Sequence, residues 1–176
     1  STSAPDLDTD PSRDGPSSGG DIDLDAAYAC GDPDFTVLTP LGGPGYDPET
    51  GFIEPLADEY VVHTTQLMVK EEQFSEFLSL SEQVTEQMQQ TPGLVAVGIA
   101  SEPNCGWQRT LGIWRSEAEM YAFAGSGAHA IAMSSTLSIS ITGKVTHWTV
   151  SPDDGLVTWE QAMAELADVS PSAVYD

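Results

Sequence analysis

The chain has 176 residues, with 5 Lys and Arg against 28 Asp and Glu and a formal net charge of -23. This length is sufficient for one domain with a sizeable core. So few cations cannot form a basic patch, which excludes nucleic acid and anionic membrane surfaces as expected partners. The sequence contains no run of about 18 apolar residues, so we expect no transmembrane segment.

Residues 1–26 have the composition of an acidic spacer rich in Ser, Gly and Asp. Such spacers resemble those that follow the lipid-modified cysteine of bacterial lipoproteins. We therefore expect an exported protein, periplasmic or extracellular, with a lipid anchor as one variant of this hypothesis. The acidity has a second interpretation, which is solubility in the cytoplasm of a salt-adapted organism.

Two Asp clusters in this spacer bear on calcium, because hard oxygen ligands at alternate positions suit that ion. Neither cluster fits the EF-hand loop, since Pro11 and Ala26 occupy the sixth position, where that loop requires Gly. A solvated spacer is the favoured interpretation, calcium on the acidic tail is the alternative, and no other metal site is predicted. The clusters comprise Asp6, Asp8, Asp10 and Asp14, and Asp21, Asp23 and Asp25.

Residues 27–58 are rich in Gly and Pro and are predicted to wrap over the domain, with a short edge strand at Phe35–Thr39. Cys30 lies in this segment and Cys105 in a later loop, and each is followed by Gly. A disulfide between them would attach the N-terminal segment to the domain, whereas two free thiols would indicate a reducing compartment. Neither cysteine lies in a CxxC pattern, so no redox or zinc role is expected.

Residues 59–150 form the predicted domain, whose βαββαβ order is the ferredoxin-like α+β unit. Runs of β-branched and apolar residues predict the strands, while apolar spacings of three and four predict the first helix. Ser116 and Glu119 form a predicted capping box for the second helix, and residues 151–176 are predicted to form a C-terminal helix, at 158–167, and a tail. The predicted strands are 60–69, 94–100, 107–114 and 141–150, and the first helix spans 70–90.

The segment 111–133 carries the most specific pattern in the chain. A strand ends at Trp114 and is followed by Ser116, a short helix, a glycine break and a second helical segment with His129. This order resembles the third strand and second helix of the antibiotic-biosynthesis-monooxygenase-like superfamily, the dimeric α+β barrels. The resemblance covers roughly residues 59–150.

A four-stranded sheet with helices on one face leaves its other face open. In this superfamily two sheets pack face to face across a dimer axis, so the resemblance implies a homodimer. The C-terminal helix and residues 27–58 are the alternative cover for the open face.

Two branches of the superfamily imply different sites. In the haem-degrading branch a helix histidine is the axial iron ligand, and an Asn on the first strand and a Trp on the second helix complete the site. By position, His129 stands for that histidine, while Phe123 replaces the Trp and Thr64 lies near the place of the Asn. One of three signature residues therefore persists, and haem is the lesser alternative.

The other branch contains cofactor-independent quinol and anthrone monooxygenases, in which the carbanion of the substrate reacts with oxygen. This chemistry needs a proton acceptor that works near neutral pH, which favours histidine. We predict His129 and His63 as catalytic residues, since the first and third strands of this sheet order are neighbours. The residues predicted to line the cavity or to bind substrate are Trp114, Phe123, Tyr121, Thr64, His147 and Trp148.

Three of these residues also have a structural interpretation. Trp114 would be an aromatic core residue. His129 would bond a carbonyl at a helix end, and His63 would be a hydrogen-bonded residue of the sheet.

The favoured hypothesis is an exported, monooxygenase-like α+β barrel protein that acts on or binds a small aromatic or hydrophobic molecule without a cofactor. The alternative is a non-catalytic exported module that binds a ligand or assembles with itself, with Phe35–Thr39 joining the sheet edge of a neighbour. The sequence leaves open whether a reaction is catalysed.

Overall fold

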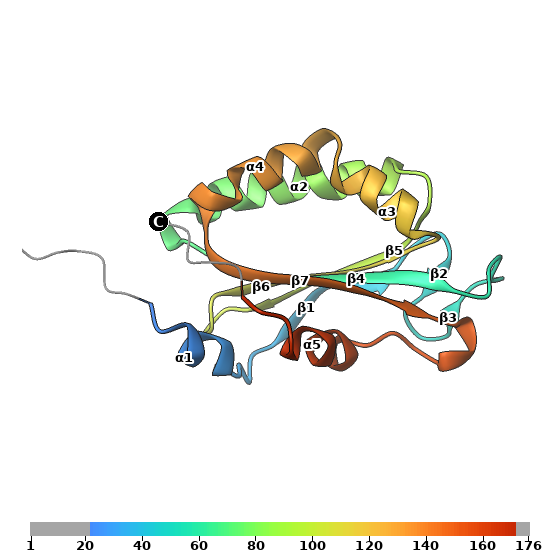
Figure 1. Cartoon of the computed structure of the whole chain (residues 1–176), viewed down its shortest axis with the longest axis horizontal. Helices are drawn as coiled ribbons and strands as arrows, with labels where there is room; N and C mark the ends of the chain where they lie inside the picture. Colours follow the sequence, from blue (N-terminus) through green and yellow to red (C-terminus); the bar gives the residue numbers. More distant parts are fainter. Residues whose placement is uncertain (1–21, 172–176) are drawn as a thin grey trace, which may run out of the picture. The chain divides into compact units, whose positions relative to one another are not determined.

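Five antiparallel strands form the main sheet of this protein (Figure 1). The computed structural model describes residues 22–171, of which residues 32–171 form one compact unit and residues 22–31 belong to another. The strands are β1 (Thr36–Gly42), β4 (Tyr60–Val69), β5 (Leu94–Glu102), β6 (Trp107–Trp114) and β7 (Ser140–Val150), and a separate hairpin contains β2 (Tyr46–Asp47) and β3 (Gly51–Phe52). The helices are α1 (Leu24–Ala29), α2 (Phe74–Gln90), α3 (Glu117–Ala124), α4 (Gly127–Ile139) and α5 (Trp159–Ala167), with 3-10 turns at Glu71–Gln73 and Pro152–Asp154.

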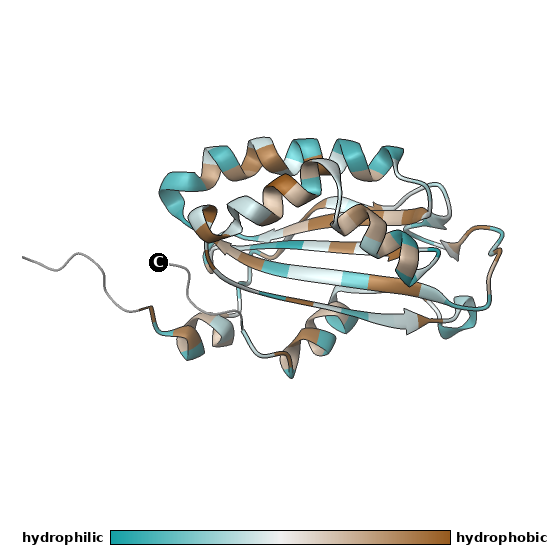
Figure 2. Cartoon of the chain, turned by 45° about the horizontal axis from the view of Figure 1, so that its top comes forward, coloured by the Kyte–Doolittle hydropathy of each residue, from teal (hydrophilic) through white to brown (hydrophobic). Residues whose placement is uncertain are grey.

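The compact unit has helices on both faces of its sheet. α2, α3 and α4 lie on one face, which we call the upper face because it is uppermost in Figure 1. α5 lies on the opposite, lower face, where the β2–β3 hairpin also packs through Tyr46 and Phe52. Turns of α2 alternate between hydrophilic and hydrophobic in Figure 2, as expected for a helix with one side toward a sheet.

The strand order is β1-β5-β6-β4-β7, and β4 lies between β6 and β7. Without β1, this is the ferredoxin-like arrangement that the βαββαβ order predicts, so the α+β fold class is confirmed. β4 and β6 are antiparallel neighbours, with His63 opposite Gly112. The sheet order therefore places the strand of His63 beside the strand that ends at Trp114, as predicted.

β1 extends the sheet beyond β5, with Val37 opposite Ala100. The predicted edge strand is thus real, but it joins the sheet of its own chain. Because β1 lies at the edge of the sheet and pairs with β5 on one side, pairing of its outer side with a neighbouring molecule stays a prediction.

The second helical region begins as the sequence predicts. Ser116 is the N-cap of α3, and its hydroxyl accepts the backbone N–H of Glu119 at 3.3 Å and donates to that residue's Oε2 at 2.8 Å. After the break at Gly125, α4 starts at Gly127, so His129 lies in its first turn. The strand and helix limits predicted for 59–150 agree with the structure to within a few residues.

The lower face of the sheet is buried under segments of the same chain. Leu111 and Ile113 of β6 have no exposed surface, and they pack in one cluster with Tyr46, Val157 and Ala162. The hydroxyl of Tyr46 accepts the backbone N–H of Val157 at 2.9 Å, which joins the hairpin to the segment before α5. The alternative cover predicted from the sequence is therefore correct, and the reason for expecting a partner sheet on this face no longer holds.

The separate unit holds the short helix α1, whose first turn is capped by the side chain of Asp23. Cys30 and Cys105 are both disulfide-bonded and are the two cysteines of the sequence, so the predicted disulfide is confirmed. Within residues 22–171, no helix is long and apolar enough to cross a membrane.

Candidate functional site

The three histidines of the chain lie close together on the upper face of the sheet. His63 of β4 is directly opposite His147 of β7, so the two side chains share a face. That face is the upper one, because Val61, two residues before His63, packs in a cluster with Trp114 and Phe123. The positive charges of His129 and His147 both act on His63, which places the three imidazoles in one electrostatic neighbourhood.

His63 is fixed by a hydrogen bond from Trp114. The indole Nε1–H donates to Nδ1 of His63 at 2.8 Å, and the two ring centroids are 6.1 Å apart. Burial, together with the smaller effects of the His129 and His147 charges, lowers the pKa of His63 from 6.5 to about 4. His63 is therefore neutral at neutral pH.

The position of the His63 ring depends on Gly112, directly opposite on β6. A Cβ atom at that position would lie 2.3 Å from Cε1 of His63, far inside van der Waals contact. Any other residue at 112 would displace the imidazole from the sheet.

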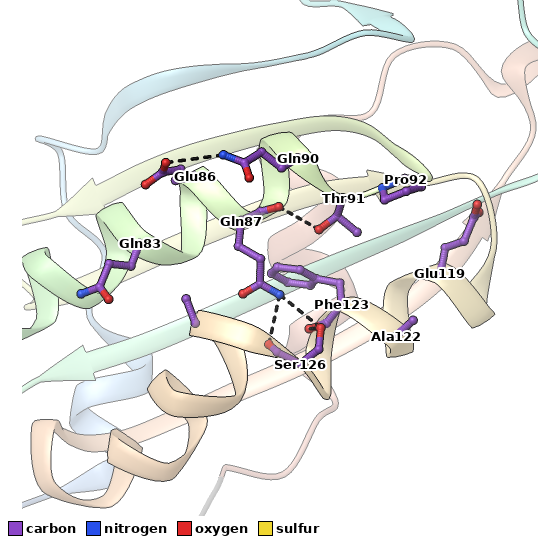
Figure 3. Close-up of a pocket in the computed structure, with 11 residues that line it drawn as sticks. Gln83, Glu86, Gln87, Gln90, Thr91, Pro92, Glu119, Ala122, Phe123 and Ser126 are labelled. Atoms are coloured by element: carbon purple, nitrogen blue, oxygen red, sulfur yellow. Dashed lines mark hydrogen bonds between the residues drawn. The ribbon is translucent and has the colours of Figure 1, made fainter.

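His129 lies at the start of α4 with its ring against Phe123, the centroids being 4.7 Å apart. Its Nδ1 is 2.8 Å from the carbonyl oxygen of Ala124. Its backbone N–H donates to Oε1 of Gln87 at 2.8 Å. Figure 3 shows the other bond of this amide, in which Nε2 of Gln87 donates to the carbonyl of Ser126 at 3.0 Å. The contact with the carbonyl agrees with the structural interpretation of His129, and it leaves Nε2 of the ring available.

His147 forms the outer edge of the cluster. Its Nε2 is 3.2 Å from Oε1 of Glu117 of α3, and both side chains are well exposed. The ring of Tyr121 meets the His147 ring edge-on at 5.9 Å. This group lies at the open side of the site, where the edge strand β7 meets α3.

A strip of half-exposed side chains runs across the upper face beside the histidines. The opposite side chains of the same strands are buried, for example Thr64 and Leu111, although both faces have helices over them. The centre of the upper face, under α2 and α4, is therefore less completely buried than the lower face. We call this set the strip; it consists of His63, Thr65, Leu67, Ile99, Ser101, Gln108 and Thr110.

The aromatic residues behind the histidines belong to the core. Trp114 is completely buried and stacks on Phe123 with centroids 5.0 Å apart. The structural interpretation of Trp114 is thus correct, and its contribution to the site is the hydrogen bond to His63. Phe123, also buried, supports the ring of His129.

Two residues expected in the cavity point to the opposite face. Thr64 follows His63 directly, and its hydroxyl donates to the carbonyl of Thr110 within the sheet. Trp148 follows His147 and packs with the cluster on the lower face. The assignment of both to the same cavity as the histidines is wrong, because adjacent residues of a strand lie on opposite faces.

Two groups of site residues were not predicted from the sequence. Thr65 and Thr110 of the strip could have been found by taking every second residue from His63 and pairing the strands. Gln87 carries no comparable signal, since its role depends on how α2 packs against α4.

A second candidate cavity lies elsewhere. It is a groove of 740 Å³ between the C-terminal half of α2 and the α3–α4 segment (Figure 3), with Phe123 as its aromatic residue. Glutamine side chains dominate its lining, and no histidine lines it. We therefore place the acid–base chemistry at the strip and not in this groove.

The residues present do not fit the lesser alternative of haem, whereas calcium on the acidic tail stays a prediction. The place of the haem-branch Trp is held by Phe123, which is buried and has no N–H group, and the strip before His129 is mostly polar. In the part of the chain that the structure describes, no group of three His, Cys, Asp or Glu side chains could hold a metal ion. Asp23 caps α1, and the first Asp cluster and Asp21 lie outside the described residues.

The fold is that of the antibiotic-biosynthesis-monooxygenase-like proteins, an α+β ferredoxin-like sheet with the helices of its βαββαβ unit on one face. No family model matches the sequence, and no curated protein matches it. A solved structure of a candidate monooxygenase from Fusobacterium nucleatum is 13% identical, with a TM-score of 0.53, over 63% of this chain and 48% of that protein. The chain thus spans about half of that relative, and at this identity the likeness shows the fold alone.

Two shorter proteins are also similar in structure. A candidate antibiotic biosynthesis monooxygenase from Nitrosomonas europaea is 13% identical over 50% of this chain and 95% of its own, with a TM-score of 0.46. A variant of SnoaB, described as a cofactor-independent oxygenase from Streptomyces nogalater, is 16% identical. The match covers 54% of this chain and 93% of that protein, with a TM-score of 0.43.

Proposed function

We propose that this protein binds a small planar hydrophobic or aromatic molecule at the strip and oxygenates it without a cofactor. The observation that carries the proposal is the gathering of three histidines beside a partly buried strip that is otherwise uncharged: His147 is opposite His63, and His129 is linked to His63 through Phe123 and Trp114. Leu67 and Ile99 offer apolar contact within the strip, while Thr65, Thr110 and Gln108 offer hydrogen bonds. Such a mixture suits a flat molecule with a few oxygen substituents.

The reaction uses a histidine to remove a proton from the substrate, either at an activated carbon or at the hydroxyl of its enol form, since both give the same carbanion. The carbanion then reacts with molecular oxygen, so that a CH₂ group and O₂ become a C=O group and water. One oxygen atom enters the product and the other leaves as water, which balances the reaction without a further reductant. General-base catalysis by a placed histidine contributes typically about 10²–10⁴-fold to such a step.

Oxygen consumption with an anthrone, 1,8-dihydroxyanthrone, as the probe tests this function. We expect uptake above autoxidation in the presence of the protein, and a loss of roughly 10²-fold or more in His129→Ala. Thr146→Ala is the matched control, since Thr146 is opposite Thr64 on the other face of the sheet. Binding of anthrone without faster oxygen uptake would contradict the catalytic proposal and favour a non-catalytic binding module.

We also propose that the protein is exported. The disulfide-bonded state of Cys30 and Cys105 supports this, because structural disulfides persist mainly in oxidising compartments. Fractionation of producing cells should recover the protein outside the cytoplasm with both thiols blocked to alkylation. Recovery in the cytoplasm with free thiols would overturn the proposal.

A further inference from the structure

We propose that His63 and His129 are a fixed pair with opposite roles, and that the pair selects a molecule with an ionisable hydroxyl beside a second oxygen atom. His63 donates a hydrogen bond from Nε2, and His129 accepts a proton at Nε2. The inference rests on the proposed function and assigns its substrate class and its residue roles. It follows from the hydrogen-bond partner that the protein supplies to each ring.

The partner of His63 can only donate. Indole has one N–H group and no acceptor, so the bond of 2.8 Å from Nε1 of Trp114 requires an unprotonated Nδ1 on His63. The ring proton of His63 must then lie on Nε2. Because the lone pair of Nδ1 is already engaged, His63 cannot serve as a base from that atom, and it presents an N–H donor.

The partner of His129 can only accept. The carbonyl oxygen of Ala124 lies 2.8 Å from Nδ1, so this nitrogen carries a proton. In the neutral ring Nε2 therefore has the free lone pair. The protein thus holds His129 in the tautomer opposite to that of His63, with its basic atom available.

Neighbouring residues hold each ring in its own position, so that His63 remains the donor and His129 remains the base. Gly112 and Trp114 confine the His63 ring, and Phe123 and Gln87 confine His129 through its ring and its backbone. Of the two carboxylates of α3, Glu117 is bonded to His147 and Glu119 accepts the hydroxyl of Ser116. The strip itself contains no carboxylate that would repel an anion.

The two rings are neighbours through Trp114 and Phe123, which stack with centroids 5.0 Å apart and contact His63 and His129 respectively. A donor and a base so placed recognise a particular chemical group. A hydroxyl can give its proton to Nε2 of His129, and the Nε2–H of His63 then bonds the neighbouring oxygen over which the negative charge spreads. Phenols and enols with an adjacent carbonyl have this arrangement. A molecule with a methylated hydroxyl lacks the proton and leaves His129 unpaired.

The tautomers can be measured without any ligand. Long-range proton–nitrogen NMR of the ¹⁵N-labelled protein resolves the ring nitrogens, and the chain has 3 histidines to assign. At neutral pH we expect the proton on Nε2 of His63 and on Nδ1 of His129. Trp114→Phe should release His63 into a mixture of tautomers, whereas Trp148→Phe on the other face should not. A proton on Nδ1 of His63 or on Nε2 of His129 in the native protein overturns the pair.

Ligand selection is tested with juglone, whose hydroxyl lies beside a carbonyl and whose colour reports ionisation, and with its methyl ether. We expect juglone to bind at least roughly tenfold more tightly than the ether, and to ionise at lower pH when bound. His129→Leu should abolish the shift in ionisation, and Trp148→Phe should retain it. Equal affinity for juglone and its ether overturns the selection while leaving the proposed binding function intact. Failure of both to bind overturns the selection and the proposed function together.

Discussion

Gln87 of α2 holds the first turn of α4 in place. Its Oε1 accepts the backbone N–H of His129 at 2.8 Å, and its Nε2 donates to the carbonyl of Ser126 at 3.0 Å. Ser126 is the N-cap of α4 but makes no capping bond with its own side chain. One helix therefore supplies the cap of another, at the turn that carries the histidine of the site.

We expect Gln87→Ala to lower the free energy of unfolding by about 1 kcal/mol, the usual value of a helix cap. The His129 resonances should also move, because the backbone N–H loses its partner. Chemical denaturation and NMR measure the two effects. Gln83→Ala is the control, since Gln83 lies one turn earlier and bonds only the carbonyl of Ser79 in its own helix. Equal losses in the two variants would argue against a capping role.

The low pKa of His63 makes the stability of the protein sensitive to acid. The folded value of about 4 is below the ordinary value of 6.5, so protonation favours the unfolded chain. Stability from this group is complete above about pH 6.5 and is lost as the pH falls toward about 4. We expect a loss of about 2–3 kcal/mol between pH 7 and pH 4.5.

His63→Gln isolates this effect, because an amide does not titrate and can still accept the Trp114 N–H. The charged groups that face His63 are His129 on α4 and His147 on β7, with Glu117 of α3 bonded to His147. These remain in the variant. The measurement is the difference in unfolding free energy between native protein and variant across this pH range. A difference that does not change with pH would show that His63 titrates normally.

Reduction of the disulfide should destabilise the protein. Cys30 and Cys105 close a long loop, and such a link stabilises by about 4 kcal/mol in the chain-entropy model. We expect the double variant Cys30→Ser, Cys105→Ser to unfold at lower denaturant concentration, and reductant to have no further effect on it. A native protein whose unfolding midpoint does not change with reductant would contradict this.

The limits of the sequence interpretation have a simple geometric cause. β6 and the cap at Ser116 could be predicted because the signals are local: alternating apolar residues, and Ser followed by Glu119. The resemblance places Thr64 in the site, near the position of the haem-branch Asn, although Thr64 is adjacent to His63 and adjacent strand residues lie on opposite faces. The same rule separates His147 from Trp148.

The rest of the site depends on contacts between residues that are far apart in the sequence, which local sequence patterns do not predict. The bond from Trp114 to His63 joins residues of two strands, and its direction follows only from the register of β4 and β6. The cover of the lower face depends on α5 returning across the sheet. Sequence order alone could not decide between that cover and a second copy of the chain.

A homodimer remains a prediction, and it now requires a surface other than the lower face. α4 contains no charged residue, in a chain with a net charge of -23. Ile131, Met133 and Leu137 of α4 are 58–59% exposed. Two copies of this acidic chain repel each other least where their contact surfaces carry no charge. Burial of the exposed apolar side chains of α4 in such a contact would also stabilise the dimer. We therefore expect dimerisation through α4.

Light scattering measures the mass in solution. We expect a dimer that strengthens as salt screens the repulsion between the acidic copies, and a monomer for Ile131→Glu. The matched control is Leu38→Glu on β1, because Leu38 is 59% exposed and lies at the far edge of the sheet. The control should remain dimeric, since the added charge is then outside the contact. A native protein that stays monomeric at high salt, or a Leu38→Glu variant that dissociates as readily as Ile131→Glu, would rule out α4 as the interface.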